Sequence, residues 1–236
     1  MSEPPAQRLR AVLFDVDFTL CQPGPQLGPF GYQESGARRG LDLDPERYRE
    51  AREAAIEDIR MHPELDHDLA VWQRFTEDIV RGMGGSGSEV AAVAEEIVLG
   101  WESHANFELY DDALPTLRAV REHGFQLALI SNTSRDLDEF VAHHRIDVDA
   151  VITSRLHGKM KPHPMIFRSL LAQLDLEPPE AVMVGDSLGD DIGGAQALGM
   201  PAVLIDRVGT NPGYTPTIAG LDELIPLLRS GLSASA

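Results

Sequence analysis

Side chains that can do chemistry recur in four short segments of this chain. They are the carboxylates Asp15 and Asp17, the hydroxyl and amide of Ser131 and Asn132, the ammonium of Lys161, and the carboxylates Asp186, Asp190 and Asp191. Carboxylates that lie close together repel one another and do not all stay ionised without a cation. All-oxygen ligands select a hard cation, and one or two carboxylates with a backbone carbonyl and waters suit Mg²⁺. If the fold brings these segments together, they predict a magnesium site.

A divalent cation beside a lysine and hydroxyl or amide donors forms a clamp for a phosphoryl group. Lys159 and Lys161 are the only two lysines of the chain, so any chemistry that needs an amine depends on this pair. Asp15 and Asp17 are two residues apart, which places both side chains on the same side of a strand end. One of them is then free to attack while the other transfers a proton.

The elements that must position these groups alternate regularly. Apolar, β-rich runs predict strands at 11–14, 126–130, 149–153, 181–184 and 201–206, and helices are predicted at 112–123, 134–145, 164–175, 189–198 and 222–230. This alternation indicates an α/β fold, a doubly wound, Rossmann-like parallel sheet with helices on both faces. Ligands bind at the carboxyl ends of the strands in such a sheet, so we expect the four segments to meet at one edge.

The segment between the first two predicted strands of the sheet has a helical residue pattern. Helices are predicted at 46–61, 68–82 and from 88 to about 104, with Asp44 as the cap and Pro45 as the first residue of the first helix. About 85 residues are too many for a loop within a compact domain. We therefore expect a core domain of residues 1–20 and 106–236 and a helical domain of residues 21–105, called the helical insertion below. Trp72 and Trp101 fall at helical spacing and are expected in its core.

Charge and composition exclude several classes of partner. The formal net charge of −18 argues against nonspecific nucleic-acid binding, which depends on neutralising phosphates with Lys and Arg. No apolar run approaches the roughly 20 residues of a membrane span, and residues 1–10 lack the apolar segment of a signal peptide. The single cysteine, Cys21, forms no internal disulfide. We expect a cytoplasmic monomer or homodimer that binds neither nucleic acid nor membrane.

The four segments, in this order, resemble the motifs of the haloacid dehalogenase (HAD) superfamily of aspartate-nucleophile hydrolases. Residues 15–20, Asp-Val-Asp-Phe-Thr-Leu, match the first motif, DxDxT. Ser131-Asn132 match the second motif, Lys161-Pro162 the third, and Gly185-Asp186-Ser187 with Asp191 the fourth. A DxDxT pattern alone is a weak signal, whereas four motifs in order at predicted strand ends are specific. The helical insertion falls where one branch of the family carries an α-helical cap.

The resemblance implies a Mg²⁺-dependent phosphatase that acts on a small phosphorylated metabolite. Asp15 would attack phosphorus and form an aspartyl-phosphate, Asp17 would protonate the leaving oxygen and then activate water, and Lys161 would pair with Asp15. The implied phosphate-binding residues are Ser131, Asn132 through its backbone N–H, and Thr19. The implied metal ligands are Asp15, Asp17 through its backbone carbonyl, Asp186 and Asp191.

Two positions depart from the family's pattern, and two roles stay open. Phe18 stands where the family often has a small residue, and is expected either to shape the leaving-group pocket or to pack under the cap. His163 stands where the family often has Asp, and adds a titratable group near the lysine. Thr19 either orients the Asp15 loop by hydrogen bonding or contacts the phosphate. Lys159 is a second candidate for the role of Lys161.

Other functions compete with this interpretation. A haloacid dehalogenase needs no metal and no acid/base group at Asp17, and a phosphonate-cleaving member would need a lysine in the helical insertion, which has none. A phosphomutase-type phosphotransferase uses the same core and is not excluded. A non-catalytic binding module would keep the fold and lose a motif residue, whereas Asp15, Asp17, Lys161 and Asp186 are all present.

Overall fold

The centre of the molecule is a parallel sheet of six strands. The computed structural model describes residues 9–60 and 66–232. The strands run in the order β5-β4-β1-β6-β7-β8, and all neighbouring pairs are parallel. They are β1 (Ala11–Phe14), β4 (Gln126–Ser131), β5 (Ala150–Thr153), β6 (Ala181–Gly185), β7 (Ala202–Ile205) and β8 (Thr217–Ile218). Ala11 lies opposite both Gln126 and Ala181, so the loops after β1, β4 and β6 leave the sheet side by side at one edge.

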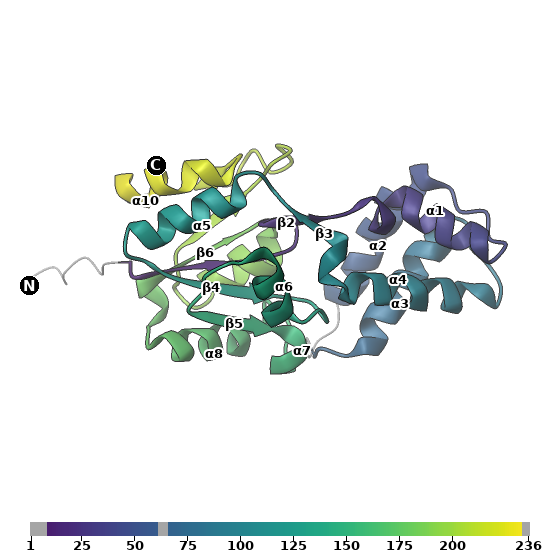
Figure 1. Ribbon diagram of the computed structural model, residues 1–236, viewed down its shortest axis with the longest axis horizontal. Helices are drawn as coiled ribbons and strands as arrows, with labels where there is room; N and C mark the ends of the chain where they lie inside the picture. The colour runs from purple at the N-terminus through teal and green to yellow at the C-terminus, as the bar shows by residue number, and fades with distance from the viewer. Residues whose placement is uncertain (1–8, 61–65, 233–236) are drawn as a thin grey trace, which may run out of the picture.

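Helices cover both faces of this sheet (Figure 1). Successive strand side chains point to opposite faces, so Val12 and Phe14 join one hydrophobic cluster while Ala11 and Leu13 join the other. Helices α5 (Ala113–Glu122), α6 (Leu137–His144) and α10 (Leu224–Ser230) pack on the first cluster, and α8 (Pro164–Leu174) and α9 (Gly194–Gln196) pack on the second. The α/β fold class predicted from the sequence is confirmed.

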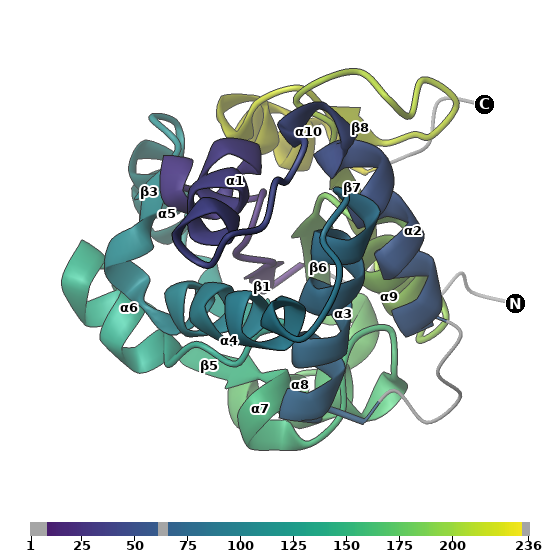
Figure 2. The same cartoon turned by 90° about the vertical axis from the view of Figure 1, so that its right-hand side faces the viewer.

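Four helices of the helical insertion lie together beside the sheet (Figure 1, Figure 2). They are α1 (Pro29–Arg38), α2 (Tyr48–Arg60), α3 (Leu69–Gly82) and α4 (Glu89–Glu102). Ile79, Val90 and Val93 belong to a hydrophobic cluster that is separate from the two beside the sheet. The chain leaves the core through β2 (Cys21–Pro23) and returns through β3 (Phe107–Leu109), which pair in antiparallel fashion. The domain division at residues 20 and 105 stays a prediction, and this strand pair straddles it.

Asp44, predicted as a helix cap, forms that cap, and Asp68, near which the second helix was predicted to start, also caps its helix. The Asp44 carboxylate accepts a hydrogen bond from the Glu46 backbone N–H at 3.0 Å, and Asp68 accepts one from the Ala70 N–H at 2.9 Å. Ser88 precedes α4, but its side chain makes no capping hydrogen bond. The helix predicted to start at residue 46 begins at Tyr48, because residues 45–47 form a 3₁₀ turn.

Several short elements are absent from the sequence-based prediction. Helix α1 contains Gly31 and Gly36, and glycine costs about 1 kcal/mol in a helix relative to alanine, which hides the helical pattern. Gly31 is nevertheless required, because a Cβ there would lie 1.9 Å from the Gln26 carbonyl oxygen. Strands β2, β3 and β8 and helix α7 (Ser154–His157) have four residues or fewer, too few to carry a periodic pattern.

Helix starts and types also differ from prediction in the second half of the chain. The helix predicted from 134 starts at Leu137, behind an Asp136 cap. The helix predicted over 189–198 is a π-helical turn, η5 (Leu188–Gly193), followed by the short α9. A π turn cannot be read from hydrophobic spacing, because it departs from the 3.6-residue period for only one turn.

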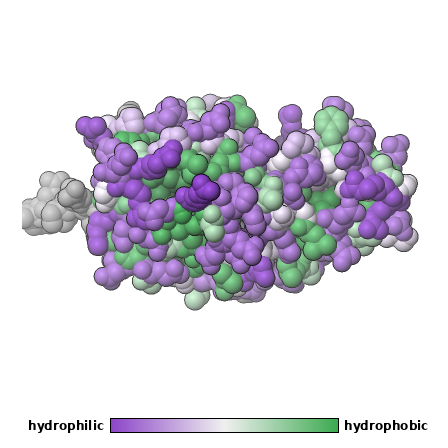
Figure 3. All heavy atoms as spheres, in the orientation of Figure 1, coloured by the Kyte–Doolittle hydropathy of each residue, from purple (hydrophilic) through white to green (hydrophobic). Residues whose placement is uncertain are grey.

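The surface is mainly hydrophilic in the view of Figure 3, where apolar side chains gather chiefly over the sheet-containing part. This matches an acidic chain of net charge −18. Within residues 9–60 and 66–232, no helix is long and apolar enough to cross a membrane.

Candidate active site

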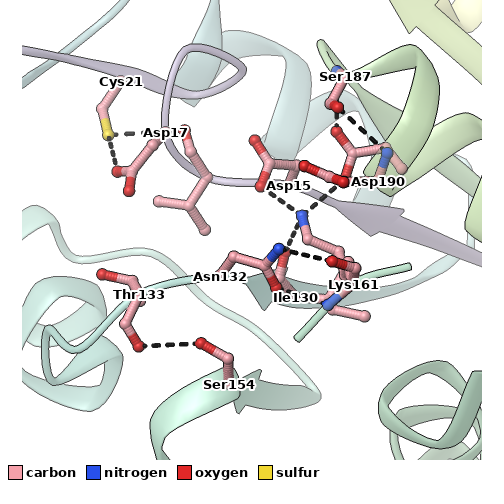
Figure 4. Close-up of polar contacts among 12 residues, drawn as sticks. Asp15, Asp17, Cys21, Ile130, Asn132, Thr133, Ser154, Lys161, Ser187 and Asp190 are labelled. Atoms are coloured by element: carbon pink, nitrogen blue, oxygen red, sulfur yellow. Dashed lines mark hydrogen bonds and ion pairs between the residues drawn. The ribbon is translucent and has the colours of Figure 1, made fainter. Parts of the chain in front are cut away.

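Lys161 is the centre of a buried cluster at the carboxyl edge of the sheet (Figure 4). Its Nζ donates to Asp15 Oδ1 at 2.6 Å and to Asp191 Oδ1 at 2.6 Å. A third hydrogen bond, of 3.1 Å, goes to the carbonyl oxygen of Ile130 near the end of β4. The lysine side chain is only 3% exposed. The loops after β1, β4 and β6 thus meet at one ammonium group.

Asn132 holds the backbone of Lys161 in place. Its Oδ1 accepts from the Lys161 backbone N–H at 2.7 Å, and its Nδ2 donates to the Lys161 carbonyl oxygen at 2.9 Å. This paired contact uses both ends of one amide side chain, so the second motif fixes the position of the third. The sequence suggested a phosphate contact for the backbone N–H of Asn132 and gave no indication of this side-chain role.

The η5 turn brings Asp191 back against the end of β6. Asp191 Oδ2 accepts from the Ser187 backbone N–H at 3.0 Å, and Ser187 Oγ accepts from the Asp190 N–H at 3.1 Å. Gly185 makes this possible, because a Cβ at that position would lie 2.3 Å from Asp191 Oδ2. The glycine of the fourth motif is therefore required by the close approach of a side chain to the strand end.

Burial dominates the electrostatics of this cluster. Burial raises the pKa of Asp15 well above its usual range, with Lys161 offsetting part of the effect. Burial, reinforced by Asp191, raises the pKa of Asp186 to about 7. Burial alone would lower the pKa of Lys161, but the charges of Asp15 and Asp191 outweigh it and raise that pKa. The lysine stays charged, and it faces more carboxylates than one ammonium neutralises.

The residues of this cluster fit a divalent cation. Carboxylate oxygens of Asp15, Asp186 and Asp191 lie within 4.8 Å of one another. Asp15 Oδ2 is buried and has no hydrogen-bond partner among the described residues. A buried, unpaired carboxylate oxygen beside two further carboxylates is energetically unfavourable unless a cation or a hydrogen-bond donor binds it. An all-oxygen set of this kind suits Mg²⁺. The Asp17 side chain is not part of the cluster.

The carboxylate of Asp17 points towards Cys21 and away from Lys161 in Figure 4. Its Oδ1 accepts a hydrogen bond from Arg135 Nη2 and a weaker one from Cys21 Sγ at 3.6 Å. Burial and the Asp17 charge raise the pKa of the Cys21 thiol, which therefore stays protonated as a donor. Asp17 is held apart from the other motif carboxylates by these contacts.

Arg135 is a residue of this site that the sequence did not reveal. Its side chain is completely buried, its guanidinium lies 3.6 Å from the centroid of the Phe107 ring, and Nη1 donates to the Trp101 carbonyl oxygen at 3.4 Å. Arg135 thus connects Asp17 to the end of α4 in the helical insertion. Its place four residues after Ser131 was the only available signal, and an arginine in the first turn of a predicted helix is usually a surface residue.

Ser131 and Thr19 differ in their access to the site. Ser131 is buried and lines the cavity described below. Thr19 is completely buried and is not among the cavity-lining residues. Its hydroxyl also has no hydrogen-bond partner among the described residues, so the expected hydrogen bond that would orient the Asp15 loop does not form. Its carbonyl oxygen accepts from Arg207 Nη2 at 3.0 Å.

Lys159 and Lys161 lie in different surroundings, and so do His163 and Phe18, the two residues that depart from the family pattern. Lys159 forms an ion pair of 2.6 Å with Asp66 and lies outside the cluster around Asp15. His163 caps helix α8, where its Nδ1 accepts from the Met165 N–H at 3.2 Å. Phe18 has a left-handed backbone (φ 66°) and lines the cavity, with the guanidinium of Arg52 4.9 Å above its ring.

A cavity of ≈ 580 Å³ is bounded by these strand ends and by the helical insertion. The sheet side contributes the polar groups of Asp15, Ser131, Lys161, Asp186 and Asp191. The insertion contributes mainly aromatic and aliphatic side chains, among them Trp72 and Trp101. Both tryptophans are half-buried at the cavity wall. The expectation that they lie in the core of the insertion is therefore wrong for Trp72. It is partly right for Trp101, which also packs against two hydrophobic clusters.

The chain is similar to known proteins over most of its length. A family model described as haloacid dehalogenase-like hydrolase matches residues 9–199. A ribulose-1,5-bisphosphate 5-phosphatase from Halopiger xanaduensis is 31% identical over 209 residues, covering 83% of this chain and 84% of that protein. A glyceraldehyde 3-phosphate phosphatase from Methanopyrus kandleri is 31% identical over 209 residues, covering 84% of each chain. The crystal structure of a HAD phosphatase from Thermococcus onnurineus matches with a TM-score of 0.63 at 29% identity, covering 93% of this chain and 98% of that one.

Proposed function

This chain belongs to the haloacid dehalogenase-like hydrolase family, and we propose that it is a Mg²⁺-dependent phosphatase that hydrolyses a small phosphorylated metabolite through an aspartyl-phosphate. The observation that carries the proposal is the Asp15 carboxylate. One of its oxygens is bound by Lys161 at 2.6 Å, and the other is buried without a partner at the cavity wall. Two of its relatives are named phosphatases of small sugar phosphates.

In the first step Asp15 attacks phosphorus in line, and the bond between phosphorus and the ester oxygen breaks. Lys161 reduces the repulsion between the carboxylate and the phosphoryl group as the two anions meet. Its fixed position, held by Asn132 at 2.7 and 2.9 Å, limits the reorganisation that this step needs. Ser131 and the backbone N–H of Asn132 bind phosphoryl oxygens.

Asp15, Asp186 and Asp191 would hold the Mg²⁺ ion, together with the backbone carbonyl of Asp17. When bound, the ion neutralises charge on the phosphoryl oxygens. The support for this set is the 4.8 Å grouping of the three carboxylates and the unpaired Asp15 Oδ2.

Asp17 is the proton-transfer group of the proposal. It gives a proton to the leaving alcohol oxygen in the first step and takes a proton from water in the second, when the aspartyl-phosphate bond breaks. In the conformation described here Arg135 and Cys21 both bind Asp17 through Oδ1, and Asp17 lines the cavity. The proposal therefore assigns proton transfer to Oδ2, while Arg135 stays bound and positions the carboxylate.

We also propose that the helical insertion, residues 21–105, is a cap on the core formed by residues 1–20 and 106–236. It covers the phosphoryl site with apolar side chains, which exclude bulk water during transfer. The acidic net charge of −18 supports a partner other than nucleic acid. The proposal also includes that the protein is a cytoplasmic monomer or homodimer.

The test is hydrolysis of p-nitrophenyl phosphate and acetyl phosphate, with Mg²⁺ and with EDTA, by the wild type and by Asp15→Asn. We expect release of inorganic phosphate only with Mg²⁺ and only by the wild type. Activity of Asp15→Asn equal to wild type would refute the aspartyl-phosphate step. If the wild type hydrolyses neither compound, the phosphatase proposal fails.

A further inference from the structure

The half of the cavity that receives the leaving group is built from aromatic rings. Five rings of the helical insertion line it, and we call them the aromatic roof: Tyr32, Tyr48, Trp72, Phe75 and Trp101. Four of them form two ring contacts: the ring centroids of Tyr32 and Tyr48 lie 5.1 Å apart, and those of Trp72 and Phe75 lie 6.0 Å apart. Ile56 and Val98 also line this cavity. The roof is therefore a packed apolar wall opposite a polar, acidic floor.

Two polar groups in this half of the cavity, on Trp72 and Thr76, have partners within the insertion. The Thr76 hydroxyl donates to the Trp72 carbonyl oxygen at 2.9 Å, and the Trp72 indole N–H donates to His67 Nδ1 at 3.4 Å. Arg52 is the one charged cavity-lining residue among the described residues of the insertion, and its guanidinium lies over the Phe18 ring. A ligand in this half of the cavity meets ring faces and very few free donors.

The cavity is larger than a phosphoryl group requires. A water molecule occupies about 30 Å³ of liquid, so ≈ 580 Å³ has room for roughly 20 waters. A phosphoryl group and a cation at the floor fill a small part of this volume. The remainder, next to the aromatic roof, is space for the alcohol part of the substrate.

We propose that the preferred substrate is a phosphate monoester whose alcohol carries an apolar ring and no second phosphate. This inference rests on the proposed phosphatase function and specifies its substrate class. The reaction is R–O–PO₃²⁻ + H₂O → R–OH + HPO₄²⁻, in which the P–O bond to the alcohol breaks and water supplies the new oxygen. A ring in R stacks on the roof, as aromatic pairs do at centroid distances of about 4.5–7 Å.

Polyhydroxyl alcohols and bisphosphates fit this half of the cavity poorly. Hydroxyl groups placed against ring faces lose their water hydrogen bonds and find no replacement. A second phosphate dianion would meet only Arg52, near a floor that carries Asp186, Asp190 and Asp191. The substrates in the names of the two phosphatase relatives are of the polar kind, so the proposal sets this chain apart from them.

The test compares kcat/KM for 2-phenylethyl phosphate with kcat/KM for glycerol 3-phosphate and ribulose 1,5-bisphosphate, in Mg²⁺. All are esters of primary alcohols. Because an apolar pocket discriminates about 10-fold or more for each well-placed apolar group, we expect 2-phenylethyl phosphate to exceed both by at least about 10-fold. Acetyl phosphate, which has no ring, reports the phosphatase chemistry itself. If acetyl phosphate is hydrolysed and the polar esters are preferred, the substrate class is wrong and the phosphatase function stands. If neither acetyl phosphate nor any of the phosphate esters is hydrolysed, both proposals fail.

A matched pair of variants on α4 compares a residue that lines the cavity beside the aromatic roof with a neighbour that does not. Val98 lines the cavity, whereas the adjacent Leu99 is 61% exposed and does not. Val98→Thr adds a hydroxyl to the cavity wall beside the aromatic roof at nearly constant side-chain volume. We expect it to lower the preference for 2-phenylethyl phosphate over glycerol 3-phosphate roughly threefold. Leu99→Thr should leave that ratio unchanged. Equal ratios in the wild type and Val98→Thr would overturn the assignment of the roof.

Discussion

The guanidinium of Arg135 donates a hydrogen bond to the carboxylate of Asp17 across 118 positions of sequence. Asp17 is the group proposed to move protons, and the arginine that binds it is completely buried. Arg135 also contacts the Trp101 carbonyl oxygen and the Phe107 ring. The orientation of Asp17 is thereby tied to the junction between the core and the helical insertion.

Arg135→Gln should lower kcat about 100-fold, the scale of general acid–base catalysis, while KM changes little, because Asp17 loses the group that positions it. The measurement is steady-state kinetics with thermal unfolding alongside. Removing one partner of a buried ion pair also costs about 3 kcal/mol of stability. Arg135→Lys is the conservative control and should recover part of kcat. A Gln variant that folds and retains the wild-type kcat would exclude a role for Arg135 in positioning Asp17.

Mg²⁺ binding should weaken as the pH falls through 7. Burial and Asp191 raise the pKa of Asp186 to about 7, so below that pH a proton occupies the carboxylate and competes with the cation, while above it the ionised ligand is available. Protonation of Asp186 should raise the apparent Kd for Mg²⁺ about fivefold from pH 7 to pH 6 and should change it little above pH 8. Calorimetric titration at each pH measures this. Asp186→Asn should remove the part of the pH dependence that is centred near pH 7, whereas Asp222→Asn, at an exposed carboxylate, should preserve it. A pH-independent Kd in the wild type would contradict the assignment.

Asn132→Ala should lower activity while preserving the proposed phosphate contact, because alanine keeps the backbone N–H. The variant loses only the two hydrogen bonds of 2.7 and 2.9 Å that hold Lys161. We expect kcat to fall about 10-fold or more through misplacement of the lysine, and the free energy of unfolding to fall by about 1–2 kcal/mol. Asn211→Ala, which alters a side chain at the same cavity, is the control and should affect both quantities less. An unchanged kcat in Asn132→Ala would show that Lys161 is held by other contacts.

Gly185→Ala should displace Asp191. The added Cβ would lie 2.3 Å from Asp191 Oδ2, so the η5 turn must shift. Such overpacking costs about 1–3 kcal/mol of stability, and activity should fall more than about 10-fold. Gly213→Ala is the matched control, because a Cβ there meets no atom within 4 Å, and its stability should change by less than about 0.5 kcal/mol. Chemical denaturation and kcat distinguish the two. Wild-type activity in Gly185→Ala would mean that Asp191 tolerates displacement.

The amino-acid sequence by itself determined the α/β class, the strands that carry the site and the segments that meet there. Runs such as 11–14 and 126–130 are apolar at every position because both faces of a parallel sheet are buried, and this pattern is local. The carboxyl ends of parallel strands converge whatever their loops contain, so Asp15, Lys161 and Asp191 could be grouped before any coordinates. The Asp44 cap was equally readable, since it joins residues two positions apart in the sequence.

Only the tertiary structure decided which side chains face one another across the chain. Arg135 resembles a surface arginine in sequence, and its burial against Asp17 and Phe107 depends on packing between distant segments. Trp72 has the spacing of a core residue, but whether a ring on an apolar helix face meets another helix or a cavity depends on how the helices are placed. Asn132 and Gly185 likewise acquire their roles from partners that the fold brings within reach. Contacts of this kind leave no periodic trace in the sequence, because each is made by a single residue with a partner set by the three-dimensional arrangement.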